Sequence, residues 1–265
     1  MKSPSLLIIQ LLLCPFLFLL LLSCSFDNND KLPEQNFDGL EEESPGSEVF
    51  VDYEYEILEE EGFASGLNLA LNDNILHQVS FEESNPFSSV WSQFCCNHSS
   101  QIILNPTNSN DKVGRFELRN TDRVTTATTT SARAEILFPS QKNKERWYAV
   151  SVFFPTTGYS KDRVTEIIMQ WHQSGYSPPS AVEVKDDQIF LRAINRNSTL
   201  NSDEVYTNHP IGEVERGKWN EFIFHYIHSP YSDGLIEIWH NGKKLNPIKG
   251  PNIRSGLSLP RFKVG

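Results

Sequence analysis

The sequence predicts an all-β protein, an antiparallel β-sandwich of the jelly-roll (concanavalin-like) kind with a concave substrate groove. First, segments that alternate between apolar and polar residues recur along the chain from about residue 75, and they are rich in β-branched and aromatic residues. Second, Pro, Gly, Asn, Asp and Ser fill the gaps between them. Third, no stretch of ten or more residues shows helical periodicity. Many short strands without intervening helices indicate antiparallel sheets packed face to face.

Each expected strand is a short alternating segment. The segments are 115–119, 147–154, 165–172, 188–194, 221–227 and 235–240. The clearest turn is Asn241-Gly242, a pair that readily takes the positive φ angles of a type I′ hairpin. We therefore expect Ile236–Trp239 to fold back on Lys244 and Leu245.

The start of the chain is typical of an export signal. Met1-Lys2 precedes an apolar run that ends in Leu21-Leu22-Ser23-Cys24. This ending resembles a bacterial lipobox, so we expect residues 1–23 to be a lipoprotein signal peptide and Cys24 to carry the lipid. The chain is then exported and anchored to the outer membrane or cell surface. The alternative is an ordinary transmembrane anchor, because a run of about seventeen residues is near the lower limit for spanning a bilayer.

The net charge of −11 is unevenly distributed. Residues 27–62 contain 14 acidic side chains and one basic side chain, Lys31, whereas the remainder of the chain is close to neutral. We expect residues 24–62 to form a flexible acidic tether and residues 63–265 to form the folded domain. A groove that binds a polyanion is therefore compatible with the composition.

The number and spacing of the cysteines predict no metal site. Cys14 and Cys24 belong to the signal, which leaves the adjacent pair Cys95 and Cys96. Adjacent cysteines join only with unusual peptide geometry, and the sequence lacks CxxC or His/Cys zinc spacing. We expect two partly buried thiols.

Three short motifs each place polar side chains on one strand face and apolar side chains on the other. In 131–136, Arg133 and Glu135 alternate with Ala134 and Ile136. In 167–172, Gln170 and His172 lie opposite Ile167, Met169 and Trp171, and in 261–265, Lys263 points outward between Phe262 and Val264. A sheet that binds a polymer would show this arrangement. Each motif also has an ordinary interpretation, since Arg-x-Glu is commonly a solvated ion pair and a strand histidine commonly a structural residue.

Together the three motifs resemble the blocks of jelly-roll polysaccharide lyases. Gln170-Trp171-His172 and Trp147-Tyr148-x-x-Ser151-x-x-Phe154-Pro155 are most similar to the heparin lyase I and glucuronan lyase group, which is related to the alginate lyases. The resemblance covers residues 75–265, with Ile136 in place of a leucine. It also implies a tyrosine four residues after Lys263, two positions beyond Gly265, so the domain is expected either to be incomplete at its C-terminus or to lack that tyrosine.

The resemblance implies cleavage of a uronate polysaccharide by β-elimination. His172 would take the C5 proton, Arg133 and Gln170 would hold the sugar carboxylate, and Lys263 would neutralise charge. The implied tyrosine would share the acid and base work. Arg192, Arg196, Glu135 and Arg119 are the expected substrate-binding residues.

Two other functions remain open. A non-catalytic glycan-binding surface lipoprotein would use the same face, and a jelly-roll glycoside hydrolase would need the paired carboxylates that the sequence lacks. The expected partners are an acidic polysaccharide and the membrane, with no nucleic acid and a monomeric chain. No cofactor is required, although Asp186-Asp187 is compatible with calcium.

Overall fold

The computed structural model of the chain describes residues 5–12, 75–125, 130–159, 161, 163–195 and 205–265. The expected tether at 24–62, the lipidation site Cys24 and the expected substrate-binding residue Arg196 lie outside these residues. Within the described ranges, no helix has the length and apolar character needed to cross a membrane.

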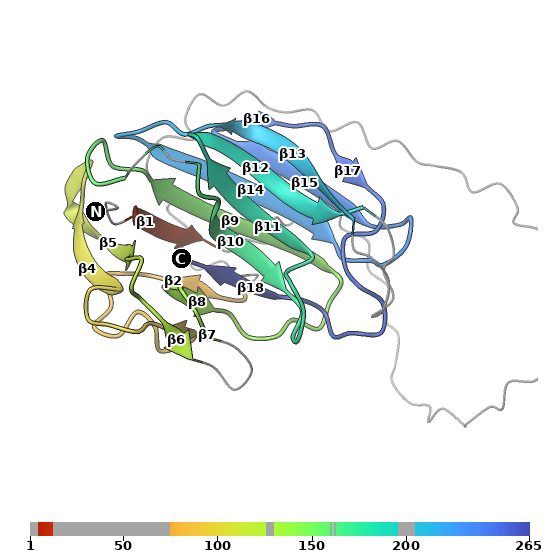
Figure 1. Cartoon of the computed structure of the whole chain (residues 1–265), viewed down its shortest axis with the longest axis horizontal. Coiled ribbons are helices and arrows are strands. Elements are labelled where there is room, and N and C mark those ends of the chain that lie inside the picture. Colours follow the sequence, from red (N-terminus) through yellow and green to blue (C-terminus); the bar gives the residue numbers. More distant parts are fainter. Residues whose placement is uncertain (1–4, 13–74, 126–129, 160, 162, 196–204) are drawn as a thin grey trace, which may run out of the picture. The chain divides into compact units, whose positions relative to one another are not determined.

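The larger sheet contains nine strands of the described chain, and each strand is antiparallel to its neighbours (Figure 1). In spatial order they are β16 (Lys243–Lys244), β15 (Leu235–His240), β14 (Trp219–Ile227), β9 (Glu145–Phe153), β1 (Ser5–Leu12), β5 (Asn108–Leu118) and β4 (Ser100–Asn105), with β17 (Ile248–Lys249) paired to β15 and β2 (Gln78–Val79) paired to β1.

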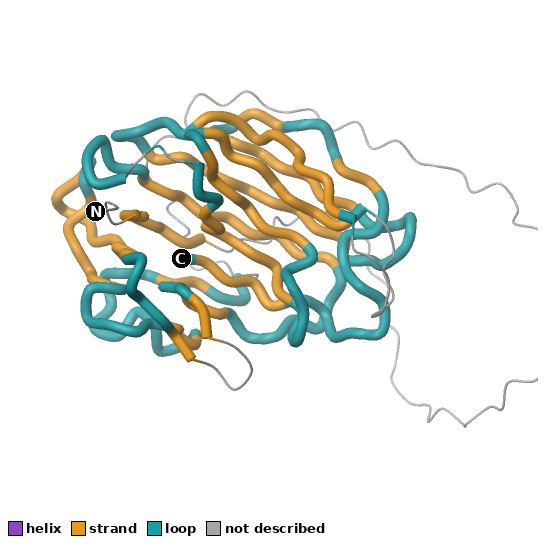
Figure 2. Tube along the Cα trace, viewed as in Figure 1, coloured by secondary structure: helices purple, strands orange, loops and turns teal. Residues whose placement is uncertain are grey.

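The smaller sheet contains seven described strands and is also antiparallel. In spatial order they are β13 (Tyr206–Glu213), β12 (Gln188–Ile194), β11 (Ser180–Lys185), β10 (Glu166–His172), β18 (Arg261–Val264), β8 (Glu135–Leu137) and β3 (Trp91–Gln93). A separate two-stranded ribbon joins β6 (Val124–Thr125) to β7 (Thr130–Ser131). Figure 2 shows that strands and loops account for the described chain, which confirms the all-β prediction.

Aromatic side chains from both sheets meet in one core between them. Trp171 of β10 is fully buried, and its ring centroid lies 4.4 Å from that of Tyr226 and 4.9 Å from that of Phe224, both on β14. Phe262 of β18 packs 5.1 Å from Trp171 and 4.9 Å from Tyr148 of β9. This packing makes the two sheets a β-sandwich, and it buries the apolar face that the alternation predicted.

The local predictions are confirmed in detail. Asn241 and Gly242 have φ angles of 49° and 77°, and Trp239 pairs with Lys244 across the hairpin that they close. The expected segments did not include β3, β4, β11 or β13. The turn between β11 and β12 is formed by Asp186 and Asp187, whose φ angles of 53° and 62° are again those of a type I′ turn.

Ser5–Leu12, within the expected signal peptide, forms a strand in the larger sheet. Ile8 pairs with Phe153 of β9 on one side and with Arg115 of β5 on the other. A short apolar run is compatible with a buried strand as well as with a signal segment, because both need continuous hydrophobicity. Export and cleavage of residues 1–23 stay predictions.

Trp171→Phe is expected to lower the free energy of unfolding by about 1–3 kcal/mol, because the smaller ring leaves a cavity between the sheets. Urea denaturation followed by fluorescence or circular dichroism would measure the change. Trp91→Phe is the matched control, since Trp91 is 55% exposed and its replacement should cost less than about 0.5 kcal/mol. Equal effects of the two substitutions would contradict the central position of Trp171.

Candidate active site

The three motifs occupy neighbouring strands of the smaller sheet. β18 lies between β10 and β8, with Gln170 paired to Lys263 and Ile136 paired to Val264. These strands are adjacent in space although Glu135 and Lys263 are 128 residues apart in the chain. The sheet therefore assembles one site from three separate segments.

The polar members of the motifs share the face that points away from the core. Met169 and Trp171 of β10 are fully buried between the sheets, so Gln170 and His172 project from the opposite face. Phe262 and Val264 likewise enter the core, which places the side chain of Lys263 on the same outer face.

Glu135 is the centre of the polar network. Its carboxylate accepts hydrogen bonds from Gln170 Nε2 at 2.7 Å, Lys263 Nζ at 3.1 Å and Arg133 Nη1 at 3.2 Å. Glu135 is 5% exposed, so the carboxylate lies beneath the donors that it holds. Glu135 thus has the contacts of a residue that positions its three donors. Arg133 and Glu135 do not form the solvated ion pair of the ordinary interpretation.

Lys263 lies on the outer face of the sheet, as the alternation predicts, but its side chain is buried there. The residue is 4% exposed and its ammonium group pairs with Glu135. Burial lowers the pKa of Lys263, although the carboxylate of Glu135 opposes this effect. Lys263 therefore presents little of its surface to solvent, and its charge lies against Glu135.

Arg133 is held by two further residues that surround its guanidinium. Its Nε donates to Ser131 Oγ at 2.8 Å and its Nη1 donates to Gln93 Oε1 at 2.8 Å. Gln93 belongs to β3, where it pairs with Glu135. The sequence offered no signal for Gln93, because only the pairing of β3 with β8 brings it to the site.

His172, at the end of β10, is half-buried and surrounded by positive charge. Burial lowers the pKa of His172 to about 4, with further lowering by Lys263, Arg133 and Arg254. The imidazole is therefore neutral at pH 7 and able to accept a proton. These same cations form a positive environment suited to an anionic ligand beside it.

Arg254 extends this environment and was missed by the sequence analysis. The side chain is 1% exposed, and its Nη2 donates to the hydroxyl of Tyr206 at 2.9 Å. Arg192 of β12 stacks 4.3 Å from the Tyr206 ring centroid, and its Nε donates to Glu183 at 2.6 Å. Arg192 pairs with Ala181, which in turn pairs with Gln170, so Arg192 lies on the same face as Gln170 and His172.

Sequence comparison identifies the kind of protein that carries this site. Residues 75–265 match the family model described as polysaccharide lyase. The chain belongs to the polysaccharide lyase family. The enzyme is therefore a lyase that acts on polysaccharides, which favours elimination over the alternative of glycoside hydrolysis.

The fold comparison agrees with this assignment. An endo-β-1,4-glucuronan lyase from the fungus Trichoderma reesei matches the lyase with a TM-score of 0.53 and 14% sequence identity, over 66% of this chain and 77% of that one. At this identity the likeness shows a common fold, the jelly-roll sandwich. Among curated proteins, none matches the chain.

Two other expected site residues of the lyase have different surroundings. Arg119 follows β5, and its Nε donates to Glu117 at 2.6 Å, so it belongs to an ion-pair cluster away from the contacts of Glu135. Asp187, considered for calcium, sits in the β11–β12 turn and pairs with Arg216 at 2.5 Å. The compatibility of this turn with calcium, and the expectation that no cofactor is required, stay predictions.

Proposed function

We propose that the lyase cleaves a uronate-containing polysaccharide by β-elimination, with His172 as the base. The observation that carries this proposal is a neutral, half-buried imidazole next to Lys263, Arg133 and Arg254, with Glu135 as the carboxylate of the network. Such a site combines a proton acceptor with an excess of positive charge, which is the combination that this reaction needs.

The chemistry explains why both features are required. The C5 proton of a uronate is weakly acidic, because removing it spreads negative charge onto a carboxylate that is already anionic. Fixed cations and hydrogen-bond donors near that carboxylate stabilise the developing charge, and each well-placed donor contributes about 3–4 kcal/mol. Arg133 supports this role because its side chain is only partly buried, with 22% accessible.

In the proposed elimination, the proton taken from C5 is returned to the product. The C5–H bond breaks as the imidazole of His172 takes the proton, the C4–O4 bond breaks, and a C4–C5 double bond forms. The imidazolium then returns the proton to O4 of the leaving sugar when that oxygen lies on the same side of the ring. The products are an unsaturated uronate and a new hydroxyl end.

Binding of a uronate would prepare His172 for this role. The substrate carboxylate offsets the charges of Lys263 and Arg133, which lower the pKa of the imidazole in the free enzyme. His172 would consequently become a stronger base in the complex than in the free enzyme.

Neighbouring sugar units would contact residues on either side of His172. Arg261 is exposed on β18 and pairs with His172, while Arg192 and Tyr206 lie on β12 and β13 beyond β11. Strands are about 4.8 Å apart, so these residues lie at distances suited to successive units of a polymer across the sheet. Cationic and aromatic side chains are suited to acidic sugars.

Glucuronan is the first substrate to test, because the matched fungal structure is described as a glucuronan lyase. Export with a lipid on Cys24 would bring the enzyme into contact with an extracellular polymer. The test is incubation with glucuronan, alginate and heparin-type glycans, followed by ultraviolet absorbance of the unsaturated product. Tight binding of each polymer with no double-bond product would favour the alternative of a glycan-binding lipoprotein.

The acid limb of the pH–rate profile is expected to lie at low pH. His172 must be neutral to accept a proton, so kcat/KM should fall as the pH decreases through about 4, the pKa of the free enzyme. The acid limb of kcat should lie at higher pH, because the bound carboxylate raises the pKa. Initial rates across the pH range in which the circular dichroism spectrum is constant would measure both limbs.

Lys263→Met provides the control for this pH dependence. Loss of one nearby cation should raise the pKa of His172 and move the acid limb of kcat/KM toward the ordinary histidine value of about 6.5. A wild-type limb already near 6.5, unmoved by Lys263→Met, would contradict the lowered pKa of His172 and the influence of Lys263 on it.

A further inference from the structure

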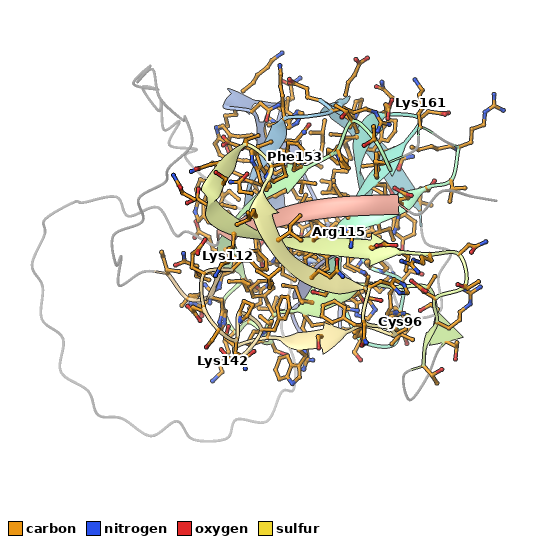
Figure 3. All side chains as sticks on the ribbon, turned by 90° about the vertical axis from the view of Figure 1, so that its left-hand side faces the viewer. Cys96, Lys112, Arg115, Lys142, Phe153 and Lys161 are labelled. Atoms are coloured by element: carbon orange, nitrogen blue, oxygen red, sulfur yellow. A yellow bond between two sulfur atoms is a disulfide. The ribbon has the colours of Figure 1, made fainter. Side chains whose placement is uncertain are left out.

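A second cluster of reactive side chains lies beyond the end of β3. It comprises Cys95, Cys96, His98 and Asp122, whose potential ligand atoms all lie within 4.8 Å of one another. The first three follow β3 and Asp122 follows β5, so residues 24 or more positions apart meet there. Figure 3 labels Cys96, which is exposed, in a view that faces this side of the molecule.

Asp122 is a buried anchor in this cluster. The residue is 3% exposed, and one carboxylate oxygen lies 2.8 Å from His98 Nε2 and accepts the backbone N–H of Arg119 at 2.8 Å. Its carboxylate oxygens lie among the ligand atoms of the other three residues, where they are able to act as oxygen ligands.

The two sulfur atoms complete a mixed ligand set. Cys96 Sγ lies 3.9 Å from the second carboxylate oxygen of Asp122, and Cys95 Sγ lies 3.4 Å from Ser99 Oγ. Cys95 and Cys96 form a disulfide with each other, so the expectation of two thiols was wrong for this structure. When that bond is reduced, the cluster offers two thiolates, one imidazole and one carboxylate, a combination that zinc and cobalt prefer in tetrahedral sites.

The spacing of these atoms suits such an ion. Bonds of about 2.0–2.3 Å in a tetrahedral arrangement place ligand atoms about 3.3–3.8 Å apart. The separation of 2.8 Å between His98 and Asp122 and that of 3.9 Å between Cys96 and Asp122 lie close to this range. Once the disulfide is reduced, rotation of the two cysteine side chains would move the sulfur atoms from bonding distance to this separation and open the position for a metal.

We propose that the dithiol form of the enzyme binds one zinc-type divalent cation through Cys95, Cys96, His98 and Asp122, and that the disulfide form does not. A dithiol or phosphine reductant supplies the two electrons that break the S–S bond, and the two thiols then lose their protons to solvent as the metal binds. Disulfide and metal exclude each other because both use the same sulfur atoms.

Titration of Co²⁺ into the full chain tests this directly. Cys14→Ser and Cys24→Ser leave Cys95 and Cys96 as the only thiols among the four cysteines. After reduction with a phosphine and its removal under anaerobic conditions, a thiol assay should find two thiols per chain. We expect one equivalent of Co²⁺ to bind, with sulfur-to-cobalt charge-transfer absorption and visible bands of tetrahedral cobalt that disappear when Zn²⁺ is added. The unreduced protein should bind at least 100-fold more weakly.

Substitutions of the ligands separate this site from adventitious binding. Cys96→Ser, His98→Gln and Asp122→Asn should each weaken Co²⁺ binding by at least tenfold, and Cys96→Ser should also reduce the charge-transfer absorption. His209→Gln on β13 is the matched histidine control and should leave binding unchanged. Thermal unfolding checks that each variant is folded. If Asp122→Asn is unstable, His98→Gln, which removes a partly exposed ligand, tests the site instead.

Two results would overturn the proposal. One is a reduced protein with two titrated thiols that binds no Co²⁺ at micromolar concentrations. The other is binding of equal affinity in the reduced wild type and in the Cys95→Ser/Cys96→Ser variant. Neither result bears on the lyase reaction, because no residue of the cluster bonds to Glu135 or His172 in the described contacts.

Discussion

His172→Ala is expected to lower kcat of the lyase by about 10²–10⁴-fold, the usual contribution of a positioned general base. The imidazole is the group at the site that is neutral at pH 7 while its neighbours Lys263, Arg133 and Arg254 are cations. Without it, water is the remaining proton acceptor. Ultraviolet absorbance of the unsaturated product from glucuronan, or from the polymer that proves to be cleaved, gives the rate.

His209→Ala is the matched control for this substitution. His209 is also half-buried in the smaller sheet and its pKa is also lowered by burial, but it pairs with Leu191 and so lies on the opposite face from Arg192. The lyase activity of His209→Ala should equal that of the wild type. Polymer binding by His172→Ala, measured by affinity electrophoresis, should be largely retained. Full lyase activity in His172→Ala would show that the base is another group.

Glu135→Ala is expected to reduce the free energy of unfolding by about 3–5 kcal/mol, in addition to its effect on activity. Lys263 is 5% exposed in its side chain, so removing the carboxylate leaves a buried ammonium group without its counter-charge. Gln170 and Arg133 lose an acceptor in the same step. Urea denaturation monitored by circular dichroism would measure the change.

The double variant Glu135→Ala/Lys263→Met isolates the charge effect. If the buried, uncompensated ammonium causes the instability, the neutral pair should be more stable than Glu135→Ala alone. Glu135→Gln should be less destabilising than Glu135→Ala, because the amide oxygen still accepts a hydrogen bond. A loss below about 1 kcal/mol in Glu135→Ala would contradict the central position of this carboxylate.

Much of the fold could be predicted because alternation reports directly on which face of a strand is buried. Gln170 and His172 alternate with Met169 and Trp171, and the structure buries the second pair in the core. The Asn241-Gly242 turn could be predicted for a similar reason, since its positive φ angles are a local property of these residues. β3, β4, β11 and β13 were missed, and the strand formed by Ser5–Leu12 could not be distinguished from an export segment by hydrophobicity alone.

The site could be predicted only in part. The motifs indicated Arg133, Gln170, His172 and Lys263, but no local pattern indicates that Gln93 holds the guanidinium of Arg133 or that the buried side chain of Arg254 reaches Tyr206. The Cys95, Cys96, His98 and Asp122 cluster was missed for the same reason. Its fourth member lies far along the chain, outside any spacing typical of a zinc motif.

The amino-acid sequence by itself determined the strands, their turns and the side of each strand that faces the core, because these depend on neighbouring residues. The tertiary structure alone decided which strands became neighbours. That choice placed Glu135 against Lys263 and Gln170, buried the ammonium group of Lys263 on the outer face of its sheet, and surrounded His172 with cations. Burial and long-range electrostatic interactions depend on distances between remote segments, and those distances exist only once the sheets have assembled.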